Sequence, residues 1–254
     1  MAAVAVVAGA APAVATQLGI SMTALQASIG ALNDLHDAPD DAGRKPGKPI
    51  PAGLVTVPVA RAVVAVGAVV GICLAGLVDG RLAALAVVVL VIGFGYDLVA
   101  KGTAWSWLPY AAGIPILLIY GWLGGAGVLP GLFAALMPMA TLAGAALSIA
   151  NARADLERDH AAGTVSVATA LGRERAWRLH AVLWVATAAV ALGSLAVGGA
   201  EPLRVVLVVA AICFMGAVIL WSRDLRPDGR ERAWEFEAVG AAIALLAWLF
   251  AAIP

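Results

Sequence analysis

The feature that most constrains this chain is a series of apolar runs, each bounded by charges, glycine or proline. A helix needs about 20 apolar residues to cross a hydrocarbon core of about 30 Å. Eight segments meet this requirement, at residues 8–32, 56–78, 82–98, 107–123, 129–150, 176–197, 203–221 and 234–253. Charged residues make up only 13% of the 254 residues, whereas a soluble domain has about 25%. We therefore predict an integral membrane protein, an all-α polytopic bundle of about eight transmembrane helices.

Charge and cysteine content exclude several classes of function. The 16 Lys and Arg residues balance the 16 Asp and Glu residues, and no basic stripe is present, so we expect no nucleic-acid partner. Cys73 and Cys213 each lie in an apolar run without a second Cys or His at metal-ligand spacing, which argues against a disulfide framework or a zinc site. No linker or soluble segment interrupts the helical pattern. We expect a single domain over residues 1–254, with the lipid bilayer as its surroundings.

The positions of the basic residues predict the orientation, because Lys and Arg are retained on the cytoplasmic side of the membrane. With eight spans, one set of loops contains only Arg81 and Arg204. We therefore expect both termini outside and the loops 33–55, 151–175 and 222–233 in the cytoplasm, most simply at a bacterial plasma membrane. The opposite set of loops holds Arg44, Lys45, Lys48, Arg61, Lys101, Arg153, Arg158, Arg173, Arg175, Arg178, Arg223, Arg226, Arg230 and Arg232.

Two of these polar loops carry the same spacing of oxygen-bearing side chains, N-x-x-x-D-x-x-x-D. Residues four apart lie on one face of a helix, and carboxylates together with substrate phosphate are the ligands that Mg²⁺ prefers. One such ladder is common on a solvated helix, but two copies on the same membrane face favour a site that holds a diphosphate through Mg²⁺. The first motif is Asn33, Asp37 and Asp41, and the second is Asn151, Asp155 and Asp159.

Basic residues accompany the motifs. Lys45 and Lys48 follow the first motif in a stretch whose three prolines, at 46, 49 and 51, prevent a helix. Lys101 lies between the motifs, five residues after Tyr96. These lysines could neutralise a diphosphate, and the alternative is the ordinary excess of cytoplasmic cations.

Together these motifs resemble those of the UbiA family of intramembrane prenyltransferases. That family carries an N-D-x-x-D-x-x-x-D motif followed by a stretch similar to D-R-x-x-K-P-x-R-P-I-P, and a second D-x-x-x-D motif followed by G-K-x-T and L-G. A Tyr four or five residues before a Lys lies between the two, as Tyr96 and Lys101 do here. The matching positions are Asp41, Lys45, Pro46, Lys48, Pro49, Ile50 and Pro51 for the first motif, and Asp155, Asp159, Gly163, Ser166, Leu171 and Gly172 for the second.

The resemblance implies a bundle of helices around a central cavity that opens sideways to lipid. It implies an enzyme of isoprenoid biosynthesis that transfers a prenyl group, an alkyl group other than methyl, from a polyprenyl diphosphate to an acceptor that the sequence does not identify. By position, the two Asn and four Asp residues of the motifs would hold Mg²⁺. Lys45, Lys48 and Lys101 would neutralise the leaving diphosphate, and Tyr96 would lie near the allylic cation.

Three departures leave alternatives open. Thr164 stands where the family has the Lys of G-K-x-T, and the second motif opens with Asn151 where many members have Asp. The family usually has nine spans, and the one before residues 8–32 is missing from the count. A catalytically degenerate member that binds a prenyl diphosphate or lipid is therefore one alternative. A transporter is a weaker one, because transport acids lie within spans, and all 16 acids here map to loops or span ends.

Overall fold

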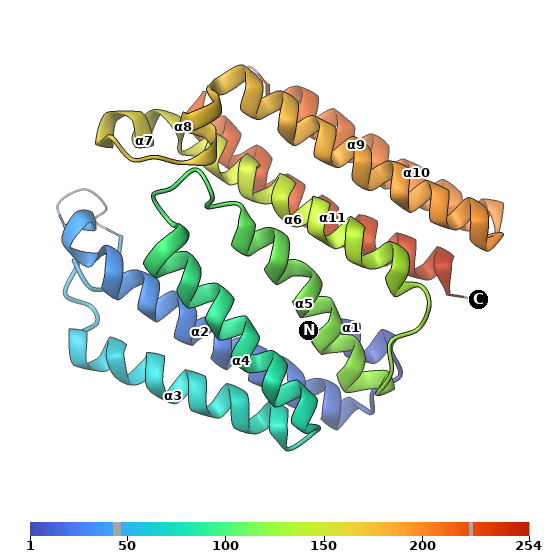
Figure 1. Cartoon of the computed structure of the whole chain (residues 1–254), viewed down its shortest axis with the longest axis horizontal. Coiled ribbons are helices and arrows are strands. Elements are labelled where there is room, and N and C mark those ends of the chain that lie inside the picture. Colours follow the sequence, from blue (N-terminus) through green and yellow to red (C-terminus); the bar gives the residue numbers. More distant parts are fainter. Residues whose placement is uncertain (43–46, 224–225, 254) are drawn as a thin grey trace. The chain divides into compact units, whose positions relative to one another are not determined.

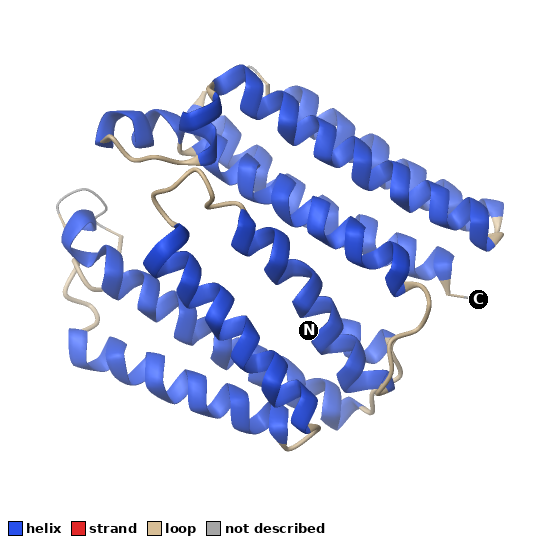
Figure 2. Cartoon of the chain, in the orientation of Figure 1, coloured by secondary structure: helices blue, strands red, loops and turns tan. Residues whose placement is uncertain are grey.

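A computed structural model describes residues 1–42, 47–223 and 226–253, apart from the side chain of Asp40. In this part of the chain every regular element is a helix, and there are no strands (Figures 1 and 2). Its elements are α1 (Ala2–Val7), α2 (Pro12–Asp41), α3 (Val57–Gly76), α4 (Gly80–Gly95), the π-helical turn η1 (Tyr96–Ala100), α5 (Leu108–Ala126), α6 (Phe133–Ala154), α7 (Leu156–Ala162), α8 (Val167–Leu171), α9 (Arg173–Gly198), α10 (Pro202–Trp221) and α11 (Pro227–Ala252).

The predicted bundle of membrane helices is confirmed. Among the described residues, seven helices are long and apolar enough to cross a membrane, namely α3, α4 with η1, α5, α6, α9, α10 and α11. α2 corresponds to the remaining predicted span and has 30 residues, but it carries more polar side chains. Several helices differ from the predicted spans in their boundaries. α2 begins at Pro12 and continues to Asp41, α6 runs from Phe133 to Ala154, and α11 begins at Pro227, seven residues before the predicted span.

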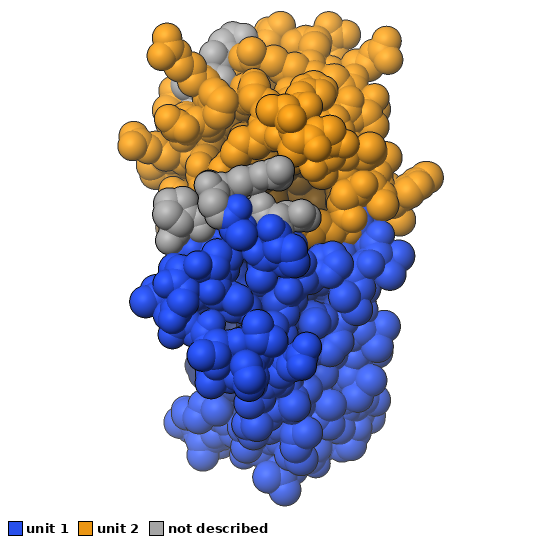
Figure 3. Space-filling model, turned by 90° about the vertical axis from the view of Figure 1, so that its left-hand side faces the viewer, with its two compact units in different colours: residues 1–100, 116–129 blue, residues 101–115, 130–254 orange. Residues whose placement is uncertain are grey.

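The chain forms two compact units (Figure 3). Unit 1 comprises residues 1–100 and 116–129, and unit 2 comprises residues 101–115 and 130–254. α5 contributes to both, because the division falls after Pro115. The expectation of a single domain stays a prediction.

In unit 1, α2 accommodates its polar side chains by bonding them to the backbone of α3. Ser21 and Ser28 donate hydrogen bonds to the carbonyl oxygens of Gly71 and Val64, at 2.7 Å each. Nε2 of Gln17 donates a hydrogen bond to the carbonyl oxygen of Leu74 at 2.8 Å. These hydrogen bonds matter because the lipid chains of a membrane offer a polar side chain no hydrogen-bond partner. A helix of modest hydropathy is thereby held inside an apolar bundle.

These bonds require α2 and α3 to approach closely, and glycine permits this. A Cβ atom added at Gly67 would lie 2.7 Å from the carbonyl oxygen of Ala24 and 3.1 Å from Cβ of Ser28. Small residues at helix interfaces serve this purpose in membrane proteins generally. The core of unit 1, which includes Leu18 and Leu25 of α2, forms around this contact.

In unit 2, α6 is the most enclosed of the candidate spans, with 56% of its apolar window buried. It packs against α9 and α11, and α10 packs against α11. At Gly144, α6 meets the backbone of Tyr110, whose oxygen would lie 2.4 Å from an added Cβ. The position of α6 matters for function because its C-terminal end leads directly into the second acidic motif.

The close approach of α2 and α3 predicts the effect of adding one methyl group. We expect Gly67→Ala to lower the free energy of unfolding by about 1–3 kcal/mol, because the new Cβ overpacks against backbone that cannot rotate away. Gly30→Ala in α2 is the matched control, since nothing lies within 4 Å of its added Cβ. At position 30, alanine should stabilise the helix relative to glycine by up to about 1 kcal/mol. Thermal unfolding in detergent compares the two, and equal midpoints would contradict the tight contact.

Candidate functional site

The first acidic motif lies on one continuous helix. Because α2 extends to Asp41, the side chains of Asn33, Asp37 and Asp41 follow one another at successive turns on one face. This part of the prediction is confirmed. The burial of these side chains increases toward the end of α2. Asn33 and Asp37 are partly exposed, whereas Asp41 is buried, at 5% exposure.

A lysine accompanies this ladder. Lys48 Nζ lies 2.6 Å from Asp34 Oδ1 and 4.0 Å from Asp41 Oδ2. Partial burial lowers the pKa of Lys48, but the hydrogen bond to Asp34 and the negative charges of the neighbouring carboxylates outweigh it, so the pKa is raised. Lys48 is therefore a firmly charged cation beside the motif, and Asp34 has a definite role in holding it. Lys45 lies outside the described residues.

An acid that the sequence analysis left without a role completes the first half of the site. Asp97 lies on the π-helical turn η1 and is 2% exposed. Its Oδ1 accepts a hydrogen bond from Nδ2 of Asn33 at 2.9 Å. Tyr96, half-buried, precedes it on the same turn. Turns of this kind inside helices occur frequently at functional sites, and an acid at the end of an apolar run was the signal that could have found Asp97.

The second acidic motif differs from the first in its backbone. α6 ends at Ala154, Asp155 lies at the junction, and Asp159 lies on the separate short helix α7. The expectation of a ladder along one helix is therefore wrong for this motif. Asp155 accepts a hydrogen bond from Nη2 of Arg158. Burial raises the pKa of Asp159, and its hydrogen bond with the side chain of Ser166 offsets this only in part.

The segment after α7 has a defined geometry. Gly163 ends α7 in the left-handed conformation, at φ 67°, where a side chain would be strained. Ser166 and Thr169 then form a capping box that starts α8, in which the side chain of each bonds to the backbone of the other. Gly163 thus ends α7 and the capping box starts α8, so the chain turns between them and the side chain of Ser166 comes within hydrogen-bond distance of Asp159.

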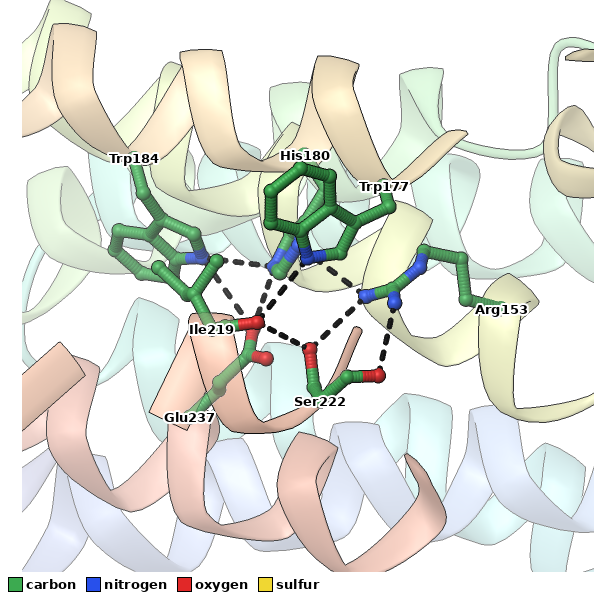
Figure 4. A network of polar contacts seen from close by, with 7 residues as sticks. All are labelled: Arg153, Trp177, His180, Trp184, Ile219, Ser222 and Glu237. Carbon is green, nitrogen blue, oxygen red and sulfur yellow. Dashed lines mark hydrogen bonds and ion pairs between the residues drawn. The ribbon is translucent and has the colours of Figure 1, made fainter. Parts of the chain in front are cut away.

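Two arginines and one histidine of unit 2 are buried. Arg153 and Arg230 are each 3% exposed, and His180 is fully buried. The sequence analysis gave His180 no role, but its Nε2 lies 2.7 Å from Oε2 of Glu237 (Figure 4). Glu237 lies within α11, and Asp97 lies in the last turn of the candidate span Gly80–Ala100.

Arg230 ties α7 to α11 by donating a hydrogen bond to Glu157 Oε2. Partial burial raises the pKa of Glu157, but the hydrogen bond and positive charge of Arg230 outweigh it, so the pKa is lowered. Lys101, the first residue of unit 2, is half-buried after η1.

The donor atoms suit a hard cation but do not form a cage. Among the described residues, no three His, Cys, Asp or Glu side chains are grouped closely enough to hold a metal ion by themselves. Mg²⁺ commonly uses one or two carboxylates and completes its shell with water and substrate phosphate. The carboxylate and amide oxygens of each motif fit that mode of binding.

The hydrogen bond between Asn33 and Asp97 predicts an energetic coupling between α2 and η1. In a double-mutant cycle of Asn33→Ala and Asp97→Ala, we expect about 1.5 kcal/mol of coupling, because one partner is a carboxylate. A cycle of Asn33→Ala with Asp79→Ala is the control, since Asp79 caps the opposite end of α4. Denaturant unfolding in detergent measures both cycles. Coupling no larger than that of the control would contradict the contact.

Comparison with known proteins places the chain in a family. The model of the UbiA prenyltransferase family matches residues 1–241. No curated protein matches the sequence. Solved structures match nearly the whole chain, although their sequence identity is low.

Three solved structures illustrate this similarity. A UbiA homologue from Aeropyrum pernix K1 has a TM-score of 0.76 and 18% identity, over 97% of this chain and 93% of its own. A digeranylgeranylglyceryl phosphate synthase has a TM-score of 0.75 and 15% identity, over 99% and 92%. A UbiA homologue from Archaeoglobus fulgidus, bound to GPP and Mg²⁺, has a TM-score of 0.71 and 18% identity, over 96% and 93%. With its membrane helices and two acidic motifs, the chain belongs to the UbiA prenyltransferase family.

Proposed function

We propose that the protein transfers a prenyl group from a polyprenyl diphosphate to an acceptor within the membrane, with the help of Mg²⁺. The observation that carries this proposal is the pair of acidic motifs, one in each unit, in a chain of the UbiA family. The Archaeoglobus fulgidus relatives bound to GPP or DMAPP with Mg²⁺ support the choice of donor.

The proposal assigns the motif residues to metal binding. The motif residues would hold the metal ion, which when bound would supply positive charge against the leaving diphosphate. Because neither motif forms a cage, the diphosphate oxygens supply the remaining ligands. The assigned residues are Asn33, Asp37, Asp41, Asn151, Asp155 and Asp159.

The lysines would act on the leaving group. Lys48 lies beside Asp41 at 4.0 Å, so a diphosphate bound through metal at Asp41 would lie within reach of its ammonium group. Fixed cations at the point where charge develops lower the barrier to ionisation. Lys45 and Lys101 are assigned the same role by their positions in the family motifs. Tyr96, on the turn that holds Asp97, would present its aromatic face to the allylic cation.

The isoprenoid tail would be bound by apolar side chains, at about 0.8 kcal/mol for each buried CH₂ group. The prenyl group leaves the diphosphate as a cation, and the acceptor supplies the electron pair of the new bond. We also propose that the acidic motifs face the cytoplasm, on the basis of the distribution of Lys and Arg.

The metal assignment predicts which variants lose the donor. A prenyl thiodiphosphate at 100 times its dissociation constant stabilises the folded protein by about 2.7 kcal/mol. We expect Asp37→Ala and Asp155→Ala to abolish the Mg²⁺-dependent part of this stabilisation while the protein stays folded in detergent. Asp79→Ala in unit 1 and Glu201→Ala in unit 2, both at helix starts outside the motifs, are matched controls that keep it. An unchanged thermal shift in both motif variants would contradict the assignment.

Turnover separates an enzyme from a degenerate binder. With radiolabelled donor and a panel of acceptor classes, release of diphosphate that requires Mg²⁺ and Asp37 supports the transferase. Donor binding without release for any acceptor or in water would favour the degenerate family member instead.

The role of Lys48 predicts a weaker hold on the diphosphate itself. We expect Lys48→Met to raise the dissociation constant of inorganic pyrophosphate with Mg²⁺ about tenfold, because a charge-assisted hydrogen bond contributes about 1.5–3 kcal/mol. Arg81→Met removes a cation from the same unit, where Arg81 pairs with Asp79 in an exposed position. Isothermal titration calorimetry compares them. Equal affinities for the two variants would remove Lys48 from the site.

A further inference from the structure

A buried polar network joins four elements of unit 2 next to the second acidic motif (Figure 4). Arg153 of α6 places Nη1 at 3.4 Å from His180 Nδ1 of α9 and Nη2 at 3.1 Å from the carbonyl oxygen of Ser222, which caps α10. His180 Nε2 lies 2.7 Å from Oε2 of Glu237 on α11. Trp184 Nε1 lies 3.3 Å from the same oxygen. All five residues are at most 8% exposed.

The chemistry of arginine determines the direction of the hydrogen bonds. Arg153 can only donate, so His180 Nδ1 accepts and the ring proton lies on Nε2. Nε2 then donates to Glu237 at 2.7 Å, and the indole Nε1 of Trp184 lies beside both groups, 3.1 Å from His180 Nε2 and 3.3 Å from Oε2 of Glu237, to which its N–H donates. The network thus places His180 between the guanidinium of Arg153 and the carboxylate of Glu237. Because the two charges balance, the cluster is tolerated in an apolar bundle.

The position of Arg153 in α6 links this network to the motif. Successive residues of a helix are rotated by about 100°. Asp155 caps α6 with helical backbone angles, and its N–H donates to Asn151 O, so the rotation holds as far as Asp155. Asn151 and Asp155 therefore lie on the side opposite to Arg153. While Arg153 is anchored in the core of unit 2, the motif residues must face outward. The side chain of Asp155 is accordingly 37% exposed. The anchor acts in the last turn of α6, which ends at Ala154 and would otherwise fray.

α11 also contacts the residues that follow Asp155 in the chain. Arg230 lies two turns before Glu237 on the same helix and donates to Glu157 of α7. Asp155 is therefore bracketed by Arg153 and Glu157, and both are tied to α11, the first through His180 and the second directly.

We infer that Arg153, held through His180 by Glu237, is a positioning residue that sets the orientation of Asn151 and Asp155 for the metal-bound diphosphate. This inference rests on the proposed function. Arg153 touches neither donor nor metal, and acts by fixing the rotation of the end of α6. Loss of either charge breaks the anchor, although for different reasons. Without Glu237 the guanidinium is buried unbalanced, and without Arg153 the side opposite to the motif has no anchor.

The test uses three variants of the full-length protein in detergent. Glu237→Gln removes the counter-charge, and the double variant Arg153→Met with Glu237→Gln removes both charges together. Ser194→Ala is the matched control, because Trp248 Nε1 donates to Ser194 Oγ at 3.0 Å and joins the same two helices, α9 and α11, far from the motif. Each is measured for thermal midpoint and for the Mg²⁺ concentration that gives half-maximal binding of prenyl thiodiphosphate.

We expect Glu237→Gln to lower the midpoint and to raise the half-maximal Mg²⁺ concentration at least tenfold. The double variant should recover much of the midpoint, since no lone charge stays buried, but it should keep the tenfold defect in Mg²⁺ dependence. Ser194→Ala should lower the midpoint and leave the Mg²⁺ dependence within twofold. A double variant that recovers both quantities, or a control that loses both, would overturn the positioning role.

A second measurement works without donor or metal. Hydrogen exchange of peptides that cover residues 150–160 should be at least tenfold faster in the double variant than in Ser194→Ala. If the unmodified protein binds no prenyl diphosphate but exchange follows this pattern, the proposed function fails while the anchor stands. If exchange at residues 150–160 is the same in both variants, the anchor is wrong whether or not the donor binds.

Discussion

Every polar group in this protein that lies within the membrane must find its partner inside the protein, since hydrocarbon offers none. This constraint explains why the regular elements of the described chain are all helices, and it also explains how the polar side chains of the chain are used. Ser21 and Ser28 bond to backbone oxygens of α3. Arg153 and Glu237 balance each other through His180. A polar side chain without a partner would lower the stability of the fold, but these side chains pair with one another or with the backbone. The resulting hydrogen bonds join particular helices and help to position the functional groups.

The two acidic motifs satisfy this constraint differently. In unit 1 the motif is the continuation of α2, so its orientation follows from the packing of a long helix against α3. In unit 2 the helix ends before the motif does, and Asp155 lies between α6 and α7. Its geometry depends on contacts with helices made later in the chain. The same pattern of one Asn and two Asp residues thus depends on a single helix in unit 1 and on contacts between several helices in unit 2.

Hydropathy alone was sufficient to predict the class of fold and the spans, because a membrane helix must be long, apolar and continuous. The spacing of Asn33, Asp37 and Asp41 also correctly predicted a helical ladder, since that property is local. The roles of Asp97, His180 and Glu237 could not be predicted in the same way. Each depends on a partner that is distant in sequence, and a lone histidine near a run of arginines has the same local pattern whether it is solvated or buried. The break at Asp155 was likewise hidden, because the periodicity of the residues continues across it.

The dependence of the second motif on α11 has a consequence for biosynthesis. Asp155 and Arg153 leave the ribosome before α9, α10 and α11 are made, so Arg153 has no counter-charge at that stage and must stay at the membrane surface. Only when α11 inserts can Glu237 draw the guanidinium into the bundle and fix the end of α6. On the inferred role of Arg153, a chain that stops short of Glu237 carries both acidic sequences but lacks the contact that orients the second one.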